Sequence, residues 1–291
     1  MKILVTGGAG FIGHHLSNTL YSLGHDVVVW DNLSTGKQER LNEKIVFKQL
    51  DVLTDILPDE RFDAVYHLAA PTSVQESLEN PEKYKMGCFD MTVRVVEWAN
   101  RNKVRYFTFA STAAVYGPTE IIPTSETDEL NPISPYAEYK LKSEEFLNEV
   151  SKKLEIQFTI TRFFNVFGEE QPSSGSYAPA VAIFLKQYGN QQPITVTGDG
   201  NQTRDYIYVK DLVDALINTI EDQPYVIETF NIGTGSEIKI IDIANAFDSE
   251  VIHIEERKEP KRSCSNIEKI NMSFGWEPQH NVIDWIKIKL K

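Results

Sequence analysis

The sequence predicts an α/β protein in which a doubly wound parallel sheet is followed by a smaller C-terminal lobe. Short β-branched runs alternate with helical stretches over the first two-thirds of the chain. Several of these runs are apolar almost throughout, as is typical of parallel strands that helices cover on both faces. A length of 291 residues, 41% of them hydrophobic, is sufficient for one large α/β domain with an appendage.

Six short apolar runs are the predicted strands of this sheet. They are Lys2–Thr6, Asp26–Trp30, Val46–Leu50, Ala64–Leu68, Tyr106–Ala110 and Phe158–Arg162. The predicted helices between them are Gly10–Leu23, Pro81–Asn102 and Pro135–Leu154. Alternation of strands and helices at this spacing predicts that the strands run parallel and are joined by right-handed crossovers.

The regular alternation of strands and helices ends after Asn165. The segment Gln171–Tyr177 is rich in Pro, Ser and Gly, which predicts a loop. The elements predicted beyond it are a helix near Pro179–Gly189, a strand at Ile194–Gly198, a helix at Asp211–Glu221 and a further strand of the main sheet at Phe230–Gly233. The C-terminal stretch mixes charged residues with Gly and Pro, which indicates a small separate lobe.

The charge balance excludes some classes of partner. The chain has 29 Lys and Arg against 42 Asp and Glu, a net charge of −13 at pH 7. This disfavours binding to nucleic acid and to anionic membrane surfaces. The two cysteines, Cys88 and Cys264, are too few for a disulfide framework or a multi-cysteine metal site, so no metal is expected. We expect a cytoplasmic enzyme.

A glycine-rich turn directly follows the first predicted strand and opens the first helix. Gly7, Gly10 and Gly13 have the spacing G-x-x-G-x-x-G, with Phe11 and Ile12 inside the motif. Glycines let the backbone turn sharply and let a pyrophosphate approach the helix N-terminus, where unpaired N–H groups favour anions. In this context the motif predicts a Rossmann-type dinucleotide site rather than an ordinary strand-to-helix turn.

Acidic residues at strand ends indicate which dinucleotide. Asp31 follows the second strand, where a carboxylate can bind both ribose hydroxyls and repel a 2′-phosphate. The next three positions, Asn32–Ser34, contain no Arg, which favours NAD, although Lys37 and Arg40 leave some room for NADP. The pair Asp51-Val52 ends the third strand, the usual place for a group that meets the adenine edge.

Tyr136 and Lys140 lie one helical turn apart on the same predicted helix face. An ammonium close to a phenol lowers the pKa of the phenol, which makes Tyr136 a candidate general base near neutral pH. The pair is common on ordinary helices, but behind a dinucleotide motif the catalytic interpretation is preferred. Ser111 and Thr112 add two hydroxyls at the end of a buried strand, where open α/β sheets bind their ligands.

Together these motifs resemble the extended short-chain dehydrogenases/reductases. The resemblance rests on the Gly7–Gly13 turn, the Asp31–Gly36 turn, the His67-Leu68-Ala69-Ala70 segment and the Tyr136/Lys140 pair. Three further segments narrow it to nucleotide-sugar epimerases and dehydratases, most closely the UDP-sugar 4-epimerase type: Arg162–Gly168, Gly198–Val209 and Asn231–Gly233. The match extends from residue 3 to about residue 276.

The resemblance implies a role for individual residues. The catalytic residues would be Thr112, Tyr136 and Lys140, and these last two would also contact NAD. The other NAD contacts would be Gly7, Gly10, Phe11, Ile12, Gly13, Asp31, Asn32, Asp51, Val52, Leu68, Ala69 and Ala70. The nucleotide sugar, with UDP expected, would contact Thr112, Tyr136, Asn165, Arg204, Tyr206 and Ser263. For Arg204 an ion pair with Asp199 or Asp205 is the structural alternative.

The resemblance also implies two domains. Residues 1–165 and about 206–247 would form the NAD-binding domain, and about 166–205 and 248–291 the nucleotide-sugar lobe. The apolar residues Val93, Val96, Trp98, Phe146, Leu147 and Val150 lie on more than one face of two predicted helices. In the resembled family these helices pair in a C2 homodimer, so a homodimer is expected. The alternative is that these residues all face the sheet.

The chain departs from the resembled pattern at two places. Cys88 stands where the family has an Asn near the nicotinamide, and we interpret it as a packed thiol rather than a nucleophile. Arg257 stands one place out of register with the family's C-terminal diphosphate-binding Arg, which leaves that contact open.

The residues after Thr112 bear on the type of reaction. A 4,6-dehydratase would need an Asp-Glu pair there, whereas this chain has Ala113-Ala114, which cannot transfer a proton. The expected reaction is therefore 4-epimerisation through a transient 4-keto sugar. The alternatives are a nucleotide-sugar dehydratase or reductase, an ordinary NAD-dependent dehydrogenase and a non-catalytic nucleotide sensor. Ser263, at the position that flanks the sugar's 2-substituent in the resembled epimerases, is small enough to admit an N-acetyl group.

Overall fold

The computed structural model describes residues 1–173, 179–220, 226–256 and 260–291. The chain divides into two compact units. Unit 1 comprises Met1–Val115, Ser134–Arg162 and Val213–Phe230, and unit 2 comprises Tyr116–Ile133, Phe163–Leu212 and Asn231–Lys291. The predicted separation into an NAD-binding and a sugar-binding domain stays a prediction.

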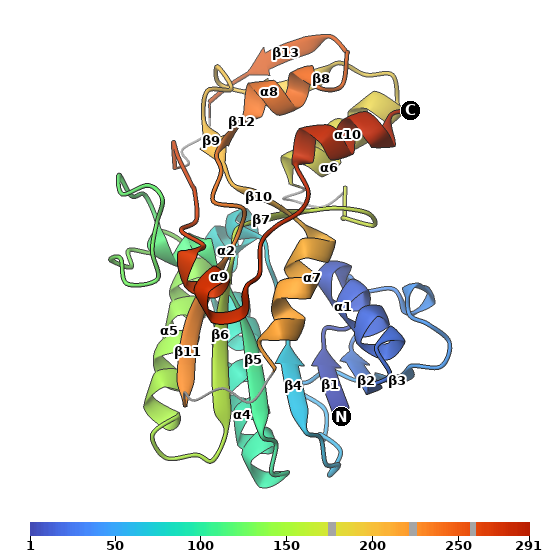
Figure 1. Cartoon of the computed structure of the whole chain (residues 1–291), viewed down its shortest axis with the longest axis vertical. Coiled ribbons are helices and arrows are strands. Elements are labelled where there is room, and N and C mark those ends of the chain that lie inside the picture. Colours follow the sequence, from blue (N-terminus) through green and yellow to red (C-terminus); the bar gives the residue numbers. More distant parts are fainter. Residues whose placement is uncertain (174–178, 221–225, 257–259) are drawn as a thin grey trace. The chain divides into compact units, whose positions relative to one another are not determined.

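A seven-stranded sheet forms the centre of unit 1 (Figure 1), in the order β11-β6-β5-β4-β1-β2-β3. Its strands are β1 (Lys2–Thr6), β2 (Asp26–Asp31), β3 (Val46–Gln49), β4 (Ala64–His67), β5 (Tyr106–Thr112), β6 (Gln157–Phe163) and β11 (Ile227–Ile232). The pairings of β1 with β2 and β4, of β2 with β3 and of β4 with β5 are parallel. The predicted doubly wound sheet is confirmed. Because β1 lies between β2 and β4, the strand order reverses at β1, where such sheets bind their ligands.

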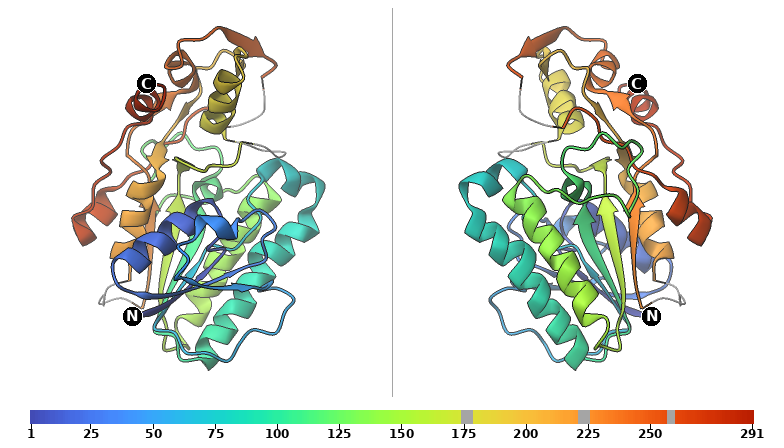
Figure 2. Two further views of the ribbon diagram at one scale, coloured as in Figure 1. Left: turned by 90° about the vertical axis from the view of Figure 1, so that its right-hand side faces the viewer. Right: turned by 90° about the vertical axis from the view of Figure 1, so that its left-hand side faces the viewer.

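Helices cover both faces of this sheet (Figure 2). On one face lie α1 (Phe11–Ser22) and α7 (Val209–Asn218), and on the other lie α4 (Met91–Arg101) and α5 (Pro135–Val150). Trp30, Phe62 and Trp98 meet in the core, with the two indole rings 4.8 Å apart in an edge-to-face arrangement. The β-branched and aromatic residues of β1, β2, β4, β5 and β6 form the buried layers that their apolar runs indicated, whereas the edge strand β3 is largely exposed.

The predicted helix Pro81–Asn102 is confirmed as a helix that runs from Pro81 to Arg101, but its middle turn is π-helical, which the sequence did not predict. The structure has α2 (Val74–Glu79), α3 (Pro81–Tyr84), a π-helical turn at Lys85–Asp90 and then α4. The π-helical turn contains Gly87, where a Cβ atom would lie 2.6 Å from the Pro71 ring. This close approach is a tertiary contact that helical periodicity does not reveal.

The described residues of unit 2 form three two-stranded sheets. Their pairs are β7 (Asn165–Phe167) with β10 (Tyr206–Tyr208), β9 (Thr203–Arg204) with β12 (Ile238–Lys239), and β8 (Ile194–Thr197) with β13 (Val251–Ile254). Its helices are α6 (Ala180–Gly189), α8 (Ile240–Asn245), α9 (Glu268–Phe274) and α10 (Val282–Lys289). The predicted helix near Pro179–Gly189 and the predicted strand at Ile194–Gly198 correspond to α6 and β8. The other strands were not predicted.

Buried carboxylates hold the segments of unit 2 together. Asp205 is fully buried and accepts hydrogen bonds from the Thr234 hydroxyl and from the backbone amides of Thr234, Gly235 and Ser265. Asp211 accepts bonds from the His280 ring and amide. These bonds satisfy carboxylates that burial would otherwise penalise. Across the part of the chain that the structure describes, no helix has the length and apolar character to cross a membrane.

Candidate active site

The predicted glycine turn lies between β1 and α1. Gly7 has a φ of +69°, and a Cβ atom there would lie 2.7 Å from the Ala69 nitrogen. A Cβ atom on Gly13 would likewise overlap the Gly7 carbonyl and lie 2.7 Å from the Gly8 Cα. Since the backbones approach this closely, only glycine fits at both positions. The turn thereby brings the end of β1 against Leu68-Ala69 at the end of β4.

The first turn of α1 has the properties of an anion site. Helix α1 begins at Phe11, with Gly10 in an extended conformation as its N-cap and so without a capping side chain. A Cβ atom on Gly10 would lie 3.1 Å from the Gly7 carbonyl oxygen, a tight contact that favours glycine here too. Phe11, Ile12 and Gly13 follow without an acidic side chain. First-turn amides without a capping side chain or an acidic neighbour fit the pyrophosphate of a dinucleotide.

Asp31 is bound to the glycine turn. Its side chain is buried, with Oδ2 accepting from the Ala9 amide at 3.0 Å and Oδ1 from the Leu33 amide at 2.8 Å. A carboxylate has about four acceptor sites, so these two bonds leave capacity for ribose hydroxyls. The position of Asp31 is thus compatible with its predicted role of binding the ribose hydroxyls of the dinucleotide.

The other predicted adenosine contacts cluster at the ends of β2 and β3. Asn32 Nδ2 donates to Asp51 Oδ2 at 2.9 Å, and the Leu53 amide donates to Asp51 Oδ1 at 2.8 Å. Val52 is 4% exposed and packs in the hydrophobic core, so its backbone, not its side chain, is the part left for a ligand. Ala70 packs against the buried cluster of Tyr84, Cys88 and Tyr136.

The structure brings Thr112 and Tyr136 together. Ser134 caps α5, its hydroxyl accepting from the Ala137 amide at 3.3 Å, and Pro135 takes the first helical position, so Tyr136 lies in the first turn. The Thr112 hydroxyl at the end of β5 faces the Tyr136 phenol closely enough to lower its pKa. The Tyr84 ring lies edge-on to the Tyr136 ring at 6.1 Å. Tyr136 is 8% exposed, and burial raises the pKa of its phenol.

Lys140 lies one turn further along α5. Its buried Nζ donates to the Ala110 carbonyl at 2.7 Å and lies 4.7 Å from the centre of the Phe109 ring. Burial lowers the pKa of this ammonium. The Tyr-x-x-x-Lys spacing predicted that Lys140 lowers the pKa of Tyr136. In the structure the pKa of Tyr136 is instead raised, because the desolvation of a buried phenolate is the largest effect on it.

His67 is a buried neighbour that the sequence assigned only to a family motif. Its Nδ1 lies 2.7 Å from the Thr6 hydroxyl and its Nε2 lies 3.2 Å from the Thr92 hydroxyl. Thr92 donates to the Cys88 carbonyl, so the His67 Nε2–H donates to Thr92 and Nδ1 accepts from Thr6. Burial and the Lys140 charge lower the pKa of His67 to about 3. His67 is therefore a neutral link between β1, β4 and α4.

Cys88 lies in the π-helical turn. Its thiol is 1% exposed, with Sγ 3.7 Å from the Pro71 carbonyl oxygen. Burial raises the pKa of the thiol, which favours the interpretation as a packed side chain over that as a nucleophile.

Apart from Thr112 and Tyr136, which belong to unit 1, the predicted substrate residues lie in unit 2. Asn165 and Tyr206 are partners in the β7–β10 pairing, and the Asn165 side chain donates to the Asp205 carbonyl at 3.1 Å. Arg204 lies on β9, and its Nη1 donates to the Thr203 carbonyl at 2.8 Å. The Asp205 carboxylate is bound to Thr234, Gly235 and Ser265, and that of Asp199 to Asn201. The structure thus places Asn165, Arg204 and Tyr206 on adjoining short strands.

Ser263 is half-buried between two constrained neighbours. The Arg262 guanidinium pairs with Glu237, and Cys264 is buried. The Thr124 amide donates to the Cys264 carbonyl at 2.8 Å, which holds this segment against the 116–133 loop of the same unit. Arg257 lies outside the described residues.

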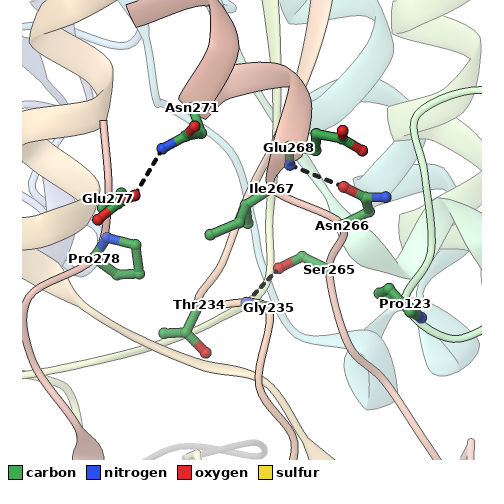
Figure 3. A pocket seen from close by; sticks show the side chains of 10 residues that line it. All are labelled: Pro123, Thr234, Gly235, Ser265, Asn266, Ile267, Glu268, Asn271, Glu277 and Pro278. Atoms are coloured by element: carbon green, nitrogen blue, oxygen red, sulfur yellow. Dashed lines mark hydrogen bonds between the residues drawn. The ribbon is translucent and has the colours of Figure 1, made fainter. Parts of the chain in front are cut away.

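A pocket of about 450 Å³ lies elsewhere in unit 2 (Figure 3). Its lining includes Thr234, Ser265, Asn266, Asn271 and Glu277. Ser265 Oγ accepts from the Gly235 amide, and Asn271 Nδ2 donates to Glu277 Oε1 at 3.1 Å (Figure 3). None of the predicted site residues is among its lining residues. The pocket is therefore separate from the predicted contacts, and within the described residues no group of His, Cys, Asp and Glu is arranged to hold a metal ion.

Comparison with known proteins places the chain in a family. The model of the NAD dependent epimerase/dehydratase family matches residues 3–233. The chain belongs to this family. The resemblance stated from the sequence motifs is confirmed, and the family's common region includes the glycine turn and the Thr112, Tyr136 and Lys140 positions.

Individual members of the epimerase/dehydratase family are similar over nearly the whole chain. A UDP-glucose 4-epimerase of Lactobacillus helveticus is 33% identical over 312 residues, covering 98% of this chain and 94% of the relative. The crystal structure of UDP-glucose 4-epimerase with UDP-glucose from Thermotoga maritima has a TM-score of 0.93 and 32% identity, covering 100% and 97% of the two chains. A UDP-N-acetylglucosamine 4-epimerase from Methanobrevibacter ruminantium, in complex with UDP-N-acetylmuramic acid, has a TM-score of 0.91 and 30% identity, covering 99% and 97%.

Proposed function

We propose that this protein is an NAD-dependent 4-epimerase that interconverts UDP-glucose and UDP-galactose. The observation that carries the proposal is the position of two sets of residues in unit 1. The glycine turn follows β1, and Thr112 lies at the end of β5, facing Tyr136 on α5, with Lys140 one helical turn further along. Because β1, β4 and β5 run parallel, their carboxyl ends meet at one edge of the sheet, where dinucleotides bind.

The residues at this edge fit NAD. The first turn of α1 offers amides without a capping side chain to the pyrophosphate, and the Asp31 carboxylate has acceptor sites for the ribose. When bound, NAD supplies reversible hydride transfer with C4 of the sugar. Leu68, Ala69 and Ala70 would contact the cofactor from the end of β4, and Asn32, Asp51 and Val52 from the ends of β2 and β3.

The chain's own residues would handle the proton. Tyr136 would accept the proton of the 4-hydroxyl and Thr112 would hold that hydroxyl by hydrogen bonding. Lys140 would hold positive charge near the phenolate, opposing the desolvation that raises the pKa of Tyr136. Ala113 and Ala114 follow Thr112 and provide no second acid or base, which favours epimerisation over dehydration.

The diphosphate and the sugar would be held by residues of unit 2. Asn165 offers an amide and Arg204 a guanidinium, which matches phosphate oxygens in geometry and charge. Tyr206 would contact the nucleotide sugar beside them. We propose that Ser263 leaves room for a 2-N-acetyl group, so that UDP-N-acetylglucosamine and UDP-N-acetylgalactosamine are also substrates.

The proposal extends to assembly and location. We propose a C2 homodimer. Three of the apolar residues on which the prediction rested, Val96, Trp98 and Leu147, are buried in the core of the same chain and so do not contribute to the interface. Val93, Phe89 and Phe146 remain partly exposed on α4, the π-helical turn and α5. We further propose that the enzyme acts in the cytoplasm, since both cysteines are free and buried. Its proposed role there is in carbohydrate metabolism, including polysaccharide biosynthesis.

The proposal is tested by incubating the protein with UDP-galactose and following the sugar by NMR. Formation of UDP-glucose without stoichiometric added NAD is the expected result, because the cofactor returns to its starting state each turnover. Accumulation of NADH would instead support a dehydrogenase, loss of water would support a dehydratase, and nucleotide binding without any conversion would support a sensor.

A further inference from the structure

Three side chains on one face of α5 lie against three consecutive residues of β5. Tyr136, Lys140 and Glu144 are spaced one helical turn apart. Tyr136 faces Thr112, Lys140 Nζ donates to the Ala110 carbonyl at 2.7 Å, and the Ser111 hydroxyl donates to Glu144 Oε1. The end of β5 that carries Thr112 is therefore bound to α5 at Ala110 and Ser111.

Glu144 is held from its other side by a residue of the next strand. Arg162 lies on β6, which neighbours β5 in the sheet. Its Nη2 donates to Glu144 Oε2 at 2.7 Å, and its Nε lies 3.2 Å from both carboxylate oxygens. Both side chains are about 95% buried or more. The Arg162 guanidinium pairs with this buried carboxylate and thereby holds Glu144 in place as the acceptor for Ser111.

We propose that Glu144, held by Arg162, is a positioning residue for the proposed epimerisation. The bond between Ser111 and Glu144 holds in place the peptide that carries Thr112. The same bond fixes α5 against β5, and with it the positions of Tyr136 and Lys140. The proposal rests on the proposed function, because Thr112 and Tyr136 act on the sugar only in that reaction. In addition, the charge of Glu144 opposes the burial that lowers the pKa of Lys140.

A stabilising ion pair without a part in catalysis is the competing explanation. The substitution Ser111→Ala distinguishes the two explanations, because it removes the bond to Glu144 and leaves the Glu144–Arg162 pair intact. Ser151→Ala is the matched control. Ser151 is also buried, and its hydroxyl donates to the Asn148 carbonyl at 3.0 Å at the far end of α5, away from β5.

The experiment measures kcat and KM for UDP-galactose, together with Tm, for the parent and both variants. Ser111→Ala is expected to lower kcat by about 10-fold to 100-fold with little change in KM, the scale of a small misplacement of a reacting group. Ser151→Ala is expected to keep the parent kcat. Tm should fall by a similar small amount in both, since each loses one buried hydroxyl bond.

A double-mutant cycle tests whether Ser111 acts through Thr112. In a Thr112→Val background, Ser111→Ala should lower kcat further by no more than about 3-fold. An unchanged kcat in Ser111→Ala, an equal fold-loss in both backgrounds, or an equal loss in Ser151→Ala would overturn the positioning role while leaving the proposed function intact. A parent protein that does not epimerise UDP-galactose would instead overturn the proposed function, and this role with it.

Discussion

At the scale of single residues, the role of the Tyr136 phenol can be tested by its removal. Tyr136→Phe keeps the ring against Tyr84 and removes the hydroxyl that faces Thr112. We expect the epimerisation kcat to fall by about 10²-fold to 10⁴-fold, the range of a lost general base. NAD content should be unchanged, because the glycine turn is untouched.

Tyr139→Phe is the matched control for this substitution. Tyr139 lies on the same helix, is partly exposed and has the Lys142 ammonium over its ring. We expect Tyr139→Phe to keep the parent kcat. A Tyr136→Phe variant that turns over within a few-fold of Tyr139→Phe would remove Tyr136 from the mechanism.

Ser263 carries a prediction about substrate choice. Ser263→Tyr would fill the space that we assign to the 2-N-acetyl group, and overpacking of a pocket costs about 1–3 kcal/mol. We therefore expect kcat/KM for UDP-N-acetylgalactosamine relative to UDP-galactose to fall by about 10-fold to 200-fold. Ser263→Ala, which adds no bulk, should keep the parent ratio. If the parent does not use the N-acetyl substrate, or Ser263→Tyr keeps the ratio, another residue controls access.

The sequence predicted the catalytic candidates better than their surroundings. Tyr136, Lys140 and Thr112 could be found because local spacing and a family motif identify them. The partners of Glu144 could not, because Ser111 and Arg162 reach it only once β5 and β6 are neighbours under α5. The raised pKa of Tyr136 also depends on burial, which the spacing of Tyr136 and Lys140 does not report.

At the scale of elements, the close approach of the glycine turn between β1 and α1 to the end of β4 can be tested by comparing two glycines. Both Gly7 and Gly24 have positive φ angles, +69° and +87°. A Cβ atom on Gly7 would overlap the Ala69 backbone, whereas one on Gly24 would meet nothing within 4 Å. Gly7→Ala should therefore displace the end of β4 and weaken NAD binding by at least about 10-fold, beyond the backbone strain of about 1 kcal/mol that both share.

The measurement is the dissociation constant of NAD, with Tm for each variant. Gly24→Ala should lower Tm slightly and leave the NAD affinity at the parent value. Equal NAD affinity in both variants would contradict the assignment of the glycine turn to the cofactor.

Elements with strong periodicity were predictable, and those shaped by tertiary contacts were not. Most strands of the main sheet were found because their apolar runs are buried on both faces, whereas the edge strand β3 is largely exposed. The π-helical turn at Lys85–Asp90 was missed because it follows from the contact of Gly87 with Pro71. The strands β7, β9, β10, β12 and β13 have two to four residues, too few to show a period.

At the scale of the whole molecule, the proposed homodimer can be checked by light scattering. We expect a particle of twice the 33.1 kDa chain mass at micromolar concentration. Phe146→Glu, which places a charge on the partly exposed face of α5, should shift the particle toward the monomer mass. Glu149→Lys, a change of charge at an exposed position of the same helix, is the control. A parent that scatters as a single chain would contradict the dimer.

The central claim is that the protein inverts C4 of a nucleotide sugar by removing a hydride and returning it. The most direct test uses UDP-galactose that carries deuterium at C4, incubated in ordinary water with no added reductant. We predict that the UDP-glucose formed keeps the deuterium at C4, because the transferred hydride does not exchange with solvent. UDP-glucose with hydrogen at C4, or no UDP-glucose at all, would contradict the account.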